Sequence, residues 1–277
     1  MKKFLMSGLA CLFLFVVVYT IQGGCNGFVQ GETMSYDSDV NMKSTLAEIQ
    51  SEIRNMYSAS RYSDVKVSTT YRTFGVVCDN LSQDRLVEQW NTSNPNKRVS
   101  GACGIVANTM LLRKYMQLTT GKLPKTYSDV EIFNAQMVYA WGSGKVFRSD
   151  DRSGTTQNQN IKRLNYYLDT YESNKYTANG DSTGLWSTCR SYLVDKIRPV
   201  LLHLNGSDTD HEVMCTAGYI ETVTYNTKVL NWSVSHTDNY KIVRICNGWE
   251  DSLQSSWNKT TNSYVFFDCV ENLIKLK

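Results

Sequence analysis

The chain has 277 residues, of which 42% are apolar and 20% are charged, so it can bury a sizeable core and is not a disordered polypeptide. Only three prolines are present, which excludes a proline-rich stalk. The formal net charge is +3, and leaving out Lys2 and Lys3 leaves 27 basic residues against 26 acidic ones, which gives no electrostatic reason to expect a nucleic acid as partner.

The first residues have the order of a secretory leader. Lys2 and Lys3 precede a nearly unbroken apolar run over residues 4–21, and Gly23-Gly24-Cys25 follows. This order predicts a signal peptide or lipoprotein leader over residues 1–25. Lipidation at Cys25, free secretion and an uncleaved anchor stay open, because an 18-residue apolar run is just long enough to span a bilayer. All three place the protein in the medium or at the cell surface, with any membrane attachment made through the N-terminus.

Cysteine usage fits a core role at most positions. Two of the eight cysteines, Cys11 and Cys25, belong to the leader, and the other six include no Cys-x-x-Cys pair and no regular spacing. Free buried cysteine is common in protein cores, and this interpretation fits most of the six. A framework of three disulfides among the six is an alternative. If one of the six is a working thiol, however, five cysteines remain, and they cannot all pair within the chain.

The segment after the leader is predicted to hold a linker, a helix and short strands. Residues 26–40 are polar and aperiodic, which is typical of a linker. Apolar spacings of three and four predict a helix over about residues 41–58. One or two strands are predicted within residues 65–77, and a loop over residues 91–101. We expect residues 41–90 to form an N-terminal extension or a short pro-segment, and residues 91–277 to form the main domain.

In the main domain, helices are predicted first and strands follow. Apolar residues from Ile105 to Met116 cover more than one helix face, which indicates a buried central helix beginning near Cys103. A capping box at Ser128 and Glu131 opens the next helix. Two more amphipathic helices are predicted over residues 161–171 and 185–197. The period then falls to two, which predicts strands at 200–204, 212–219, 229–234, 240–246 and 264–268. Helices followed by a five-strand meander indicate an α+β fold.

Three residues carry the candidate chemistry. Cys103 lies in the small-residue turn Ser100-Gly101-Ala102-Cys103-Gly104 at the start of the buried helix, where a helix N-terminus favours the nucleophilic thiolate and lowers the thiol pKa. His211 opens the strand sequence HEVMCTAGY, and Asn247 follows the strand sequence KIVRIC. Each alone has an ordinary structural interpretation, as a core cysteine, a solvated loop-end histidine or a turn asparagine.

Together, the order Cys, His, Asn is that of Cys-His nucleophilic catalysis. The thiol opens a helix while the imidazole and the amide lie on later strands, so nucleophile and base are expected to face each other across a cleft. The Asn247 side-chain oxygen would accept a hydrogen bond from the imidazole and fix its tautomer. Trp249 would shield that hydrogen bond from water.

At these residues the sequence resembles papain-like cysteine peptidases, in particular the branch of bacteriocin-processing peptidases. The matching segments are GACGIVANTMLLRKYM at Cys103, RPVLLHL followed by HEVMCTAGY at His211, and YKIVRICNGWEDS at Asn247. The resemblance spans about residues 95–270. It implies a papain-like fold, in which a helical half with the nucleophile at a helix N-terminus packs on an antiparallel sheet half. It also implies hydrolysis of a peptide or protein substrate through a thioester, with Cys103 as nucleophile, His211 as base and Asn247 as the orienting residue.

Three positions depart from the family pattern. Many relatives in that branch carry Asp where Asn247 stands. The residue after the histidine is usually small or apolar and here is Glu212, whose side chain should turn to the other face of the strand. Papain-like enzymes also place an oxyanion-binding Gln six residues before the cysteine, and here that position is Lys97.

The missing Gln leaves the oxyanion donor to be found elsewhere. Asn96, Asn94 or Gln89 could substitute, and none of the three is in register with the family position. The backbone N–H of Cys103 would supply the other donor.

Other classes of protein fit parts of this pattern. His211 and Cys215 lie four residues apart, which on a strand is about 13 Å and too far to share a metal ion, so we expect no metal and no cofactor. The same thioester chemistry serves a cell-wall amidase or a transglutaminase-like acyl transferase. A catalytically inactive surface-binding protein of the same fold is the third alternative, and Glu212 and the absent Gln favour it slightly.

Overall fold

The computed structural model describes residues 43, 45–72, 81–99, 102–120, 128–142, 156–172, 175–205, 211–229, 232–248 and 263–277. By its internal contacts the chain divides into two units, Met1–Asp39 and Val40–Lys277, and every described residue belongs to the second unit. The predicted leader, the linker and Cys25 lie outside the described residues. Among those that are described, no helix is long and apolar enough to cross a membrane.

Most of the described helices lie between β1 (Tyr62–Arg72) and β2 (Ala178–Asp181) in the chain. The described helices are α2 (Leu46–Met56), α3 (Gln83–Ser93), α4 (Cys103–Thr120), α5 (Asp129–Gly142), α6 (Gln157–Tyr171) and α7 (Leu185–Arg190), with a 3-10 turn η1 (Pro95–Lys97) and a π-turn η2 (Ser191–Asp195). The predicted capping box is confirmed. The Glu131 N–H donates to Ser128 Oγ over 3.2 Å, and the Ser128 N–H donates to Glu131 Oε2 over 3.0 Å.

The predicted loop over residues 91–101 is wrong in its first part, because α3 continues to Ser93. Ser82 caps this helix by accepting the Arg85 N–H, and a buried apolar stripe holds the helix on the core. Residues 94–99 are a short 3-10 turn and irregular chain. Asn91 fixes it, since its side chain donates to the Val99 carbonyl over 2.9 Å and accepts the Val99 N–H over 2.8 Å.

The described strands form a 7-stranded antiparallel sheet. They are β1 (Tyr62–Arg72), β2 (Ala178–Asp181), β3 (Val200–Leu204), β4 (His211–Val229), β5 (Trp232–Cys246), β6 (Ser263–Phe266) and β7 (Val270–Leu276), with a 3-10 turn η3 (Phe267–Cys269) after β6. The strand order is β2-β7-β3-β4-β5-β6, and β1 pairs with β4. Helices with an antiparallel sheet make the α+β class that the sequence predicts. The five-strand meander is wrong, because β7 lies between β2 and β3. Within the predicted strand at 229–234, Val229 is the last residue of β4 and pairs with Trp232, the first residue of β5.

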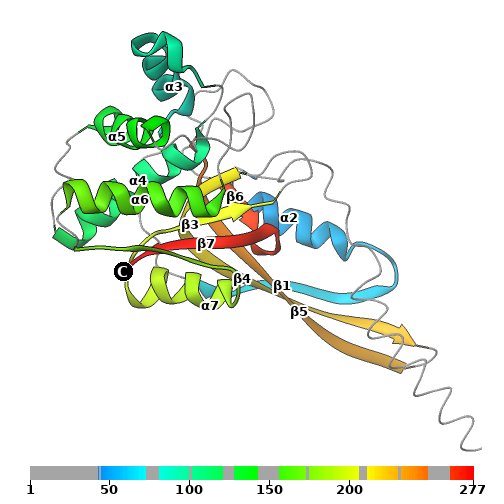
Figure 1. The fold of residues 1–277 in the computed structure, drawn as a ribbon. Helices are drawn as coiled ribbons and strands as arrows, with labels where there is room; N and C mark the ends of the chain where they lie inside the picture. Colours follow the sequence, from blue (N-terminus) through cyan, green and yellow to red (C-terminus); the bar gives the residue numbers. More distant parts are fainter. Residues whose placement is uncertain are drawn as a thin grey trace, which may run out of the picture. The chain divides into compact units, whose positions relative to one another are not determined.

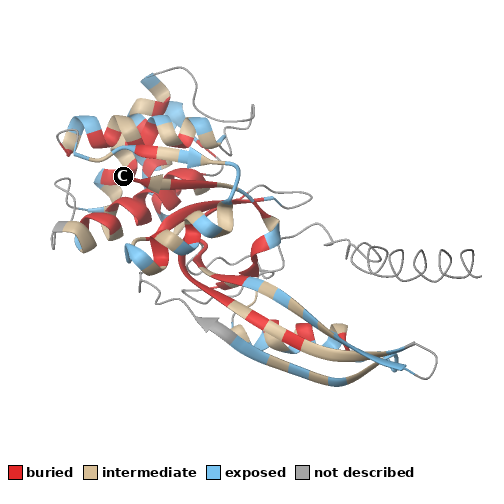
Figure 2. Ribbon diagram, turned by 90° about the horizontal axis from the view of Figure 1, so that it is seen from below, coloured by how far each residue is buried: buried red, intermediate tan, exposed pale blue. Residues whose placement is uncertain are grey.

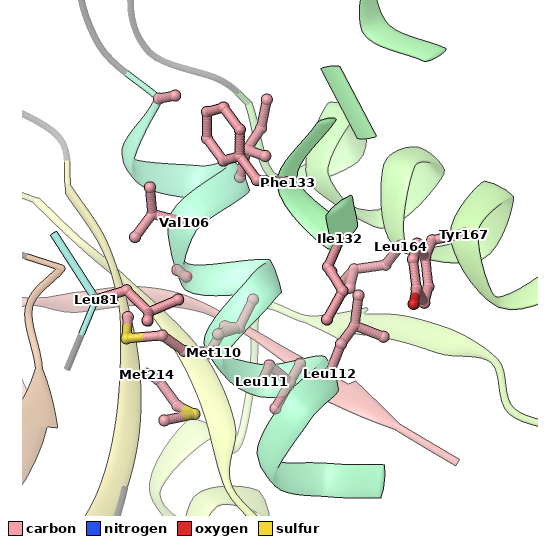
Figure 3. Packing of buried hydrophobic residues seen from close by; sticks show 14 of the residues in the cluster. Leu81, Val106, Met110, Leu111, Leu112, Ile132, Phe133, Leu164, Tyr167 and Met214 are labelled. Carbon is pink, nitrogen blue, oxygen red and sulfur yellow. The ribbon is translucent and has the colours of Figure 1, made fainter. Parts of the chain in front are cut away.

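Alternating side chains of the sheet enter two different cores. Leu201 and Met214 belong to the core built on α4, α5 and α6, whereas Leu202 and Val213 belong to the core beneath α7. Figure 1 shows α4–α6 and α7 on opposite sides of the central strands. α4 is the buried central helix that its sequence predicts, with residues 104–112 all buried. Figure 3 shows Met110 of α4 beside Met214 of β4, and Leu112 toward Leu164 of α6.

The N-terminal segment belongs to the same compact unit as the rest. α2 covers the second half of β4 with Ile49 and Ile53, which pack with Tyr219 and Val223. β1 extends the sheet by pairing with residues 219–227 of β4. Both elements therefore pack with the sheet within the unit Val40–Lys277, and the division at residue 90 stays a prediction.

Candidate functional site

Cys103 is the first residue of α4, and its thiol is free; the residue as a whole is partly exposed, although the sulfur itself is buried. Ala102 precedes the helix, and its carbonyl accepts the N–H groups of Ile105 and Val106, both over 2.9 Å. The first N–H groups of a helix have no partner within it, so at the start of α4 they are available to a group at that end, where Cys103 lies. The N–H groups of Glu212, at the start of β4, and of Gly104 and Cys103 itself lie near enough to the Cys103 sulfur to lower its pKa.

The predicted lowering of the Cys103 pKa is wrong. Burial raises the pKa of this thiol above its ordinary value. The N–H groups of Glu212, Gly104 and Cys103 lower the pKa. The negative charge of the Glu212 carboxylate raises it further. Burial is the largest of these effects, so the resting sulfur is a thiol at neutral pH.

His211, the first residue of β4, is only 3% exposed. Its Nε2 lies 2.7 Å from the backbone carbonyl oxygen of Asn247. A carbonyl oxygen can only accept, so Nε2 carries a hydrogen and donates. Burial lowers the pKa of His211 from 6.5 to about 4, although the Asn247 carbonyl and the Glu212 carboxylate act in the opposite direction. The ring is therefore neutral at pH 7, with its lone pair on Nδ1.

Asn247 lies at the end of β5 and is 1% exposed. Its backbone carbonyl makes the hydrogen bond to the imidazole that we expected from its side-chain oxygen. The side-chain Nδ2 donates to Ser263 Oγ over 3.4 Å. Gly248 follows with φ +80°, and a Cβ there would lie 3.2 Å from Val106 Cγ1 of α4. A glycine therefore allows the end of β5 to turn against the helix that carries Cys103.

Gln83, the first residue of α3, belongs to the site and was not predicted from the sequence. The Ala102 N–H donates to its side-chain Oε1 over 3.3 Å, and its own N–H donates to the Gly248 carbonyl over 2.8 Å. Gln83 thus connects the residue before Cys103 to the residue after Asn247. The Ser82 cap and the apolar positions after it are enough to predict α3, but only the packing of α3 shows which residues Gln83 meets.

The two carboxylate oxygens of Glu212 have different surroundings. Its side-chain Oε2 lies 2.9 Å from His203 Nδ1, and the two residues are directly paired across β3 and β4. Because successive side chains alternate, this places the carboxylate on the His203 face of the strand and the imidazole of His211 on the other face. Glu212 Oε1 is buried with no hydrogen-bond partner in the described part of the chain.

A buried arginine is the second group that the sequence analysis missed. Arg163 of α6 is 1% exposed, and its Nη1 donates to Asn160 Oδ1 over 3.3 Å. Burial lowers its pKa to about 10, and the negative charge of a Cys103 thiolate raises it. Arg163 is thus a cation at neutral pH within electrostatic reach of Cys103.

The structure brings some of the predicted residues together. His211 and Asn247 share a hydrogen bond, and the N–H of Glu212, the neighbour of His211, is close enough to the Cys103 sulfur to lower its pKa. Asn96 is exposed in η1, and the Lys97 carbonyl accepts the Trp90 indole N–H over 2.8 Å. Trp249 lies outside the described residues. No group of three or more His, Cys, Asp or Glu side chains in the described ranges is arranged to hold a metal ion.

The cysteines outside the site divide into two kinds. Cys246, beside Asn247, is disulfide-bonded and departs from the free-thiol interpretation. Cys189, Cys215 and Cys269 are free thiols, like Cys103.

Comparisons with known proteins add little to this geometry. No protein-family model matches the sequence, and no curated protein matches it. Among solved structures, recombinant stem bromelain precursor is similar over 79% of this chain and 87% of its own, with 10% identity and a TM-score of 0.29. A likeness this weak carries no argument about function. The proposal below therefore depends on the residues themselves.

Proposed function

We propose that the chain is an exported cysteine peptidase in which Cys103 attacks the carbonyl carbon of a peptide bond. The observations that carry this proposal are the Glu212 N–H at the start of β4, which is close enough to the Cys103 sulfur to lower its pKa, and the neighbouring His211, which donates to the Asn247 carbonyl. These contacts bring a helix-terminal thiol and a neutral imidazole of defined tautomer to the same strand end. That is the arrangement a Cys-His nucleophilic mechanism needs.

The neutral resting state defines the order of proton transfers. His211 Nδ1 takes the thiol proton as the sulfur attacks, and the resulting imidazolium then protonates the departing amine. The product is a thioester on Cys103, which a water molecule hydrolyses with His211 again as base. The cation of Arg163 and the N–H groups at the sulfur stabilise the negative charge while it is on sulfur.

The tetrahedral intermediate needs two donors for its oxyanion. The backbone N–H of Cys103 is one, as the sequence predicts. For the other we propose the side-chain amide of Gln83, whose oxygen already accepts the Ala102 N–H next to the nucleophile. Asn96 stays a prediction from the sequence, and it lies on an exposed turn.

Two observations support export. The leader sequence is one, and the disulfide at Cys246 is the other, because disulfides persist mainly in oxidising compartments. A cell-wall amidase and an acyl transferase would use the same residues. We favour a peptidase because the three matching sequence segments resemble peptidases.

The raised Cys103 pKa specifically favours one other candidate, an inactive surface-binding protein of this fold. Alkylation by iodoacetamide over a range of pH separates the two candidates. For the peptidase, alkylation of Cys103 should be slow at neutral pH and faster above pH 9. A substrate-like peptide aldehyde should bind and protect Cys103, and alkylation should speed up again when the aldehyde is displaced. For the inactive protein, the aldehyde should neither bind nor protect Cys103.

The direct test is turnover of a quenched fluorescent peptide library by the full chain. Cys103→Ala should abolish turnover, and Cys269→Ala, which removes another partly exposed free thiol, should leave it unchanged. Trapping of an acyl group on Cys103, seen by mass spectrometry, would establish the thioester. Equal turnover in both variants would overturn the proposal.

A further inference from the structure

Two buried thiols lie in contact away from the candidate site. Cys189 of α7 and Cys215 of β4 have their sulfur atoms 3.8 Å apart, and both side chains are 0% exposed. Both are free. Such a distance is a contact between two sulfurs, and a covalent S–S bond of about 2.05 Å would bring them roughly 1.7 Å closer.

The surroundings of the pair are apolar and separate from Cys103. Cys189 and Cys215 pack in the core beneath α7 with Leu193, Val200 and Ile245. Cys103 begins α4, which packs on the opposite face of the sheet. The central strands therefore keep the nucleophilic thiol apart from the thiol pair.

We propose that Cys189 and Cys215 are a modification site, at which the chain forms a structural disulfide when it folds under oxidising conditions. The bond would join α7 covalently to β4, the strand that begins with His211. The inference goes beyond the peptidase proposal and does not depend on it.

The chemistry balances with a small-molecule disulfide as oxidant. One cysteine, as its thiolate, attacks a sulfur of glutathione disulfide, and one glutathione thiolate leaves. The second cysteine then attacks the protein sulfur of the mixed disulfide, the protein disulfide forms, and the second glutathione thiolate leaves. The two cysteines lose two protons and two electrons, and glutathione disulfide gains the two electrons.

Burial determines when this exchange can occur. The Cys215 contact and burial both raise the pKa of Cys189 well above its ordinary value, so the folded protein offers little thiolate and no open path to an oxidant. The bond should therefore form before the core beneath α7 closes. Oxidation of the folded, reduced protein should be much slower than oxidation during refolding.

The experiment compares refolding of the full chain in a glutathione redox buffer with refolding in reductant. After alkylation and trypsin cleavage without reduction, peptides 176–190 and 197–228, each with one of the two cysteines, should appear joined. Oxidation at Cys246 confirms that the buffer acted. If Cys246 is oxidised while both peptides carry the alkyl group, the proposal is wrong.

Thermal unfolding provides a second measurement that does not need the peptides. The Tm difference between oxidised and reduced protein should be larger in the wild type than in Cys189→Ala by roughly 5 °C or more, because only the wild type gains this bond. The remaining difference in the variant comes from Cys246. Cys269→Ala is the matched control and should keep the full wild-type difference. Equal differences in wild type and Cys189→Ala would also overturn the proposal.

Discussion

The two ends of the β4–β5 hairpin share one hydrogen-bond ladder but have opposite surroundings. At one end His211, Cys246 and Asn247 are buried between α4 and the neighbouring strands. At the other end Trp232 is 77% exposed and Val234 is 42% exposed. Figure 2 shows the exposed strand ends beyond the buried region. The two ends thus have the same backbone pairing, and the candidate site lies at the end where helices pack against the strands.

The largest contrast between the two ends should be in turnover. His211→Gln keeps the side-chain volume but removes the base, so peptide turnover should fall by about a thousandfold or more. Trp232→Ala at the exposed end should leave turnover within about twofold of wild type. Initial rates on a peptide substrate, with circular dichroism as folding control, measure both. Similar losses in the two variants would show that His211 has no special part in the reaction.

The buried end should also control how stability depends on pH. The pKa of His211 falls from 6.5 to about 4 on folding, so its contribution to stability is complete above pH 6.5 and is lost as the pH falls toward 4. The loss attributable to His211 should be on the order of 3 kcal/mol at most. Urea unfolding at pH 7 and pH 4.5 should show a weaker pH dependence in His211→Gln than in wild type. His236→Gln, at the exposed half of β5, should keep the wild-type dependence.

The turn that ends β5 offers a smaller effect with an internal control. Gly248→Ala forces a side chain into φ +80° and places its Cβ 3.2 Å from Val106, so the free energy of unfolding should fall by roughly 1–3 kcal/mol. Gly142→Ala, where nothing lies within 4 Å of the added Cβ, should be neutral or slightly stabilising. Chemical denaturation measures both variants. A stable Gly248→Ala protein would mean that the contact of β5 with α4 adjusts freely.

The smallest effect is expected at the Asn247 side chain. Since the backbone carbonyl binds the imidazole, Asn247→Ala keeps that hydrogen bond and loses the one to Ser263, worth about 1 kcal/mol. Turnover should fall by less than about tenfold. A loss as large as that of His211→Gln would indicate that the side-chain oxygen orients the ring during the reaction, as the sequence pattern predicts.

Local patterns in the sequence were sufficient to predict many of the helices and strands. The capping box at Ser128, the all-round apolar helix after Cys103 and the strand at Val200–Leu204 follow from short-range spacing, because caps and burial periodicity depend on neighbours in the chain. The short strands β2 and β7 were missed, since their pairing with each other and with β3 is a long-range contact without a local signal.

The candidate site divides in the same way. The sequence by itself determined the residue types and their order, Cys103 at a helix start, then His211 and Asn247 at strand ends, because these positions follow from local turns. Only the tertiary structure decided their environment. Burial raises the pKa of Cys103 and lowers that of His211, a backbone carbonyl replaces the side chain of Asn247, and Gln83 and Arg163 come to the site from distant helices. The physical reason is that desolvation and long-range contacts depend on which segments pack together. The local sequence of one segment does not determine its packing partners.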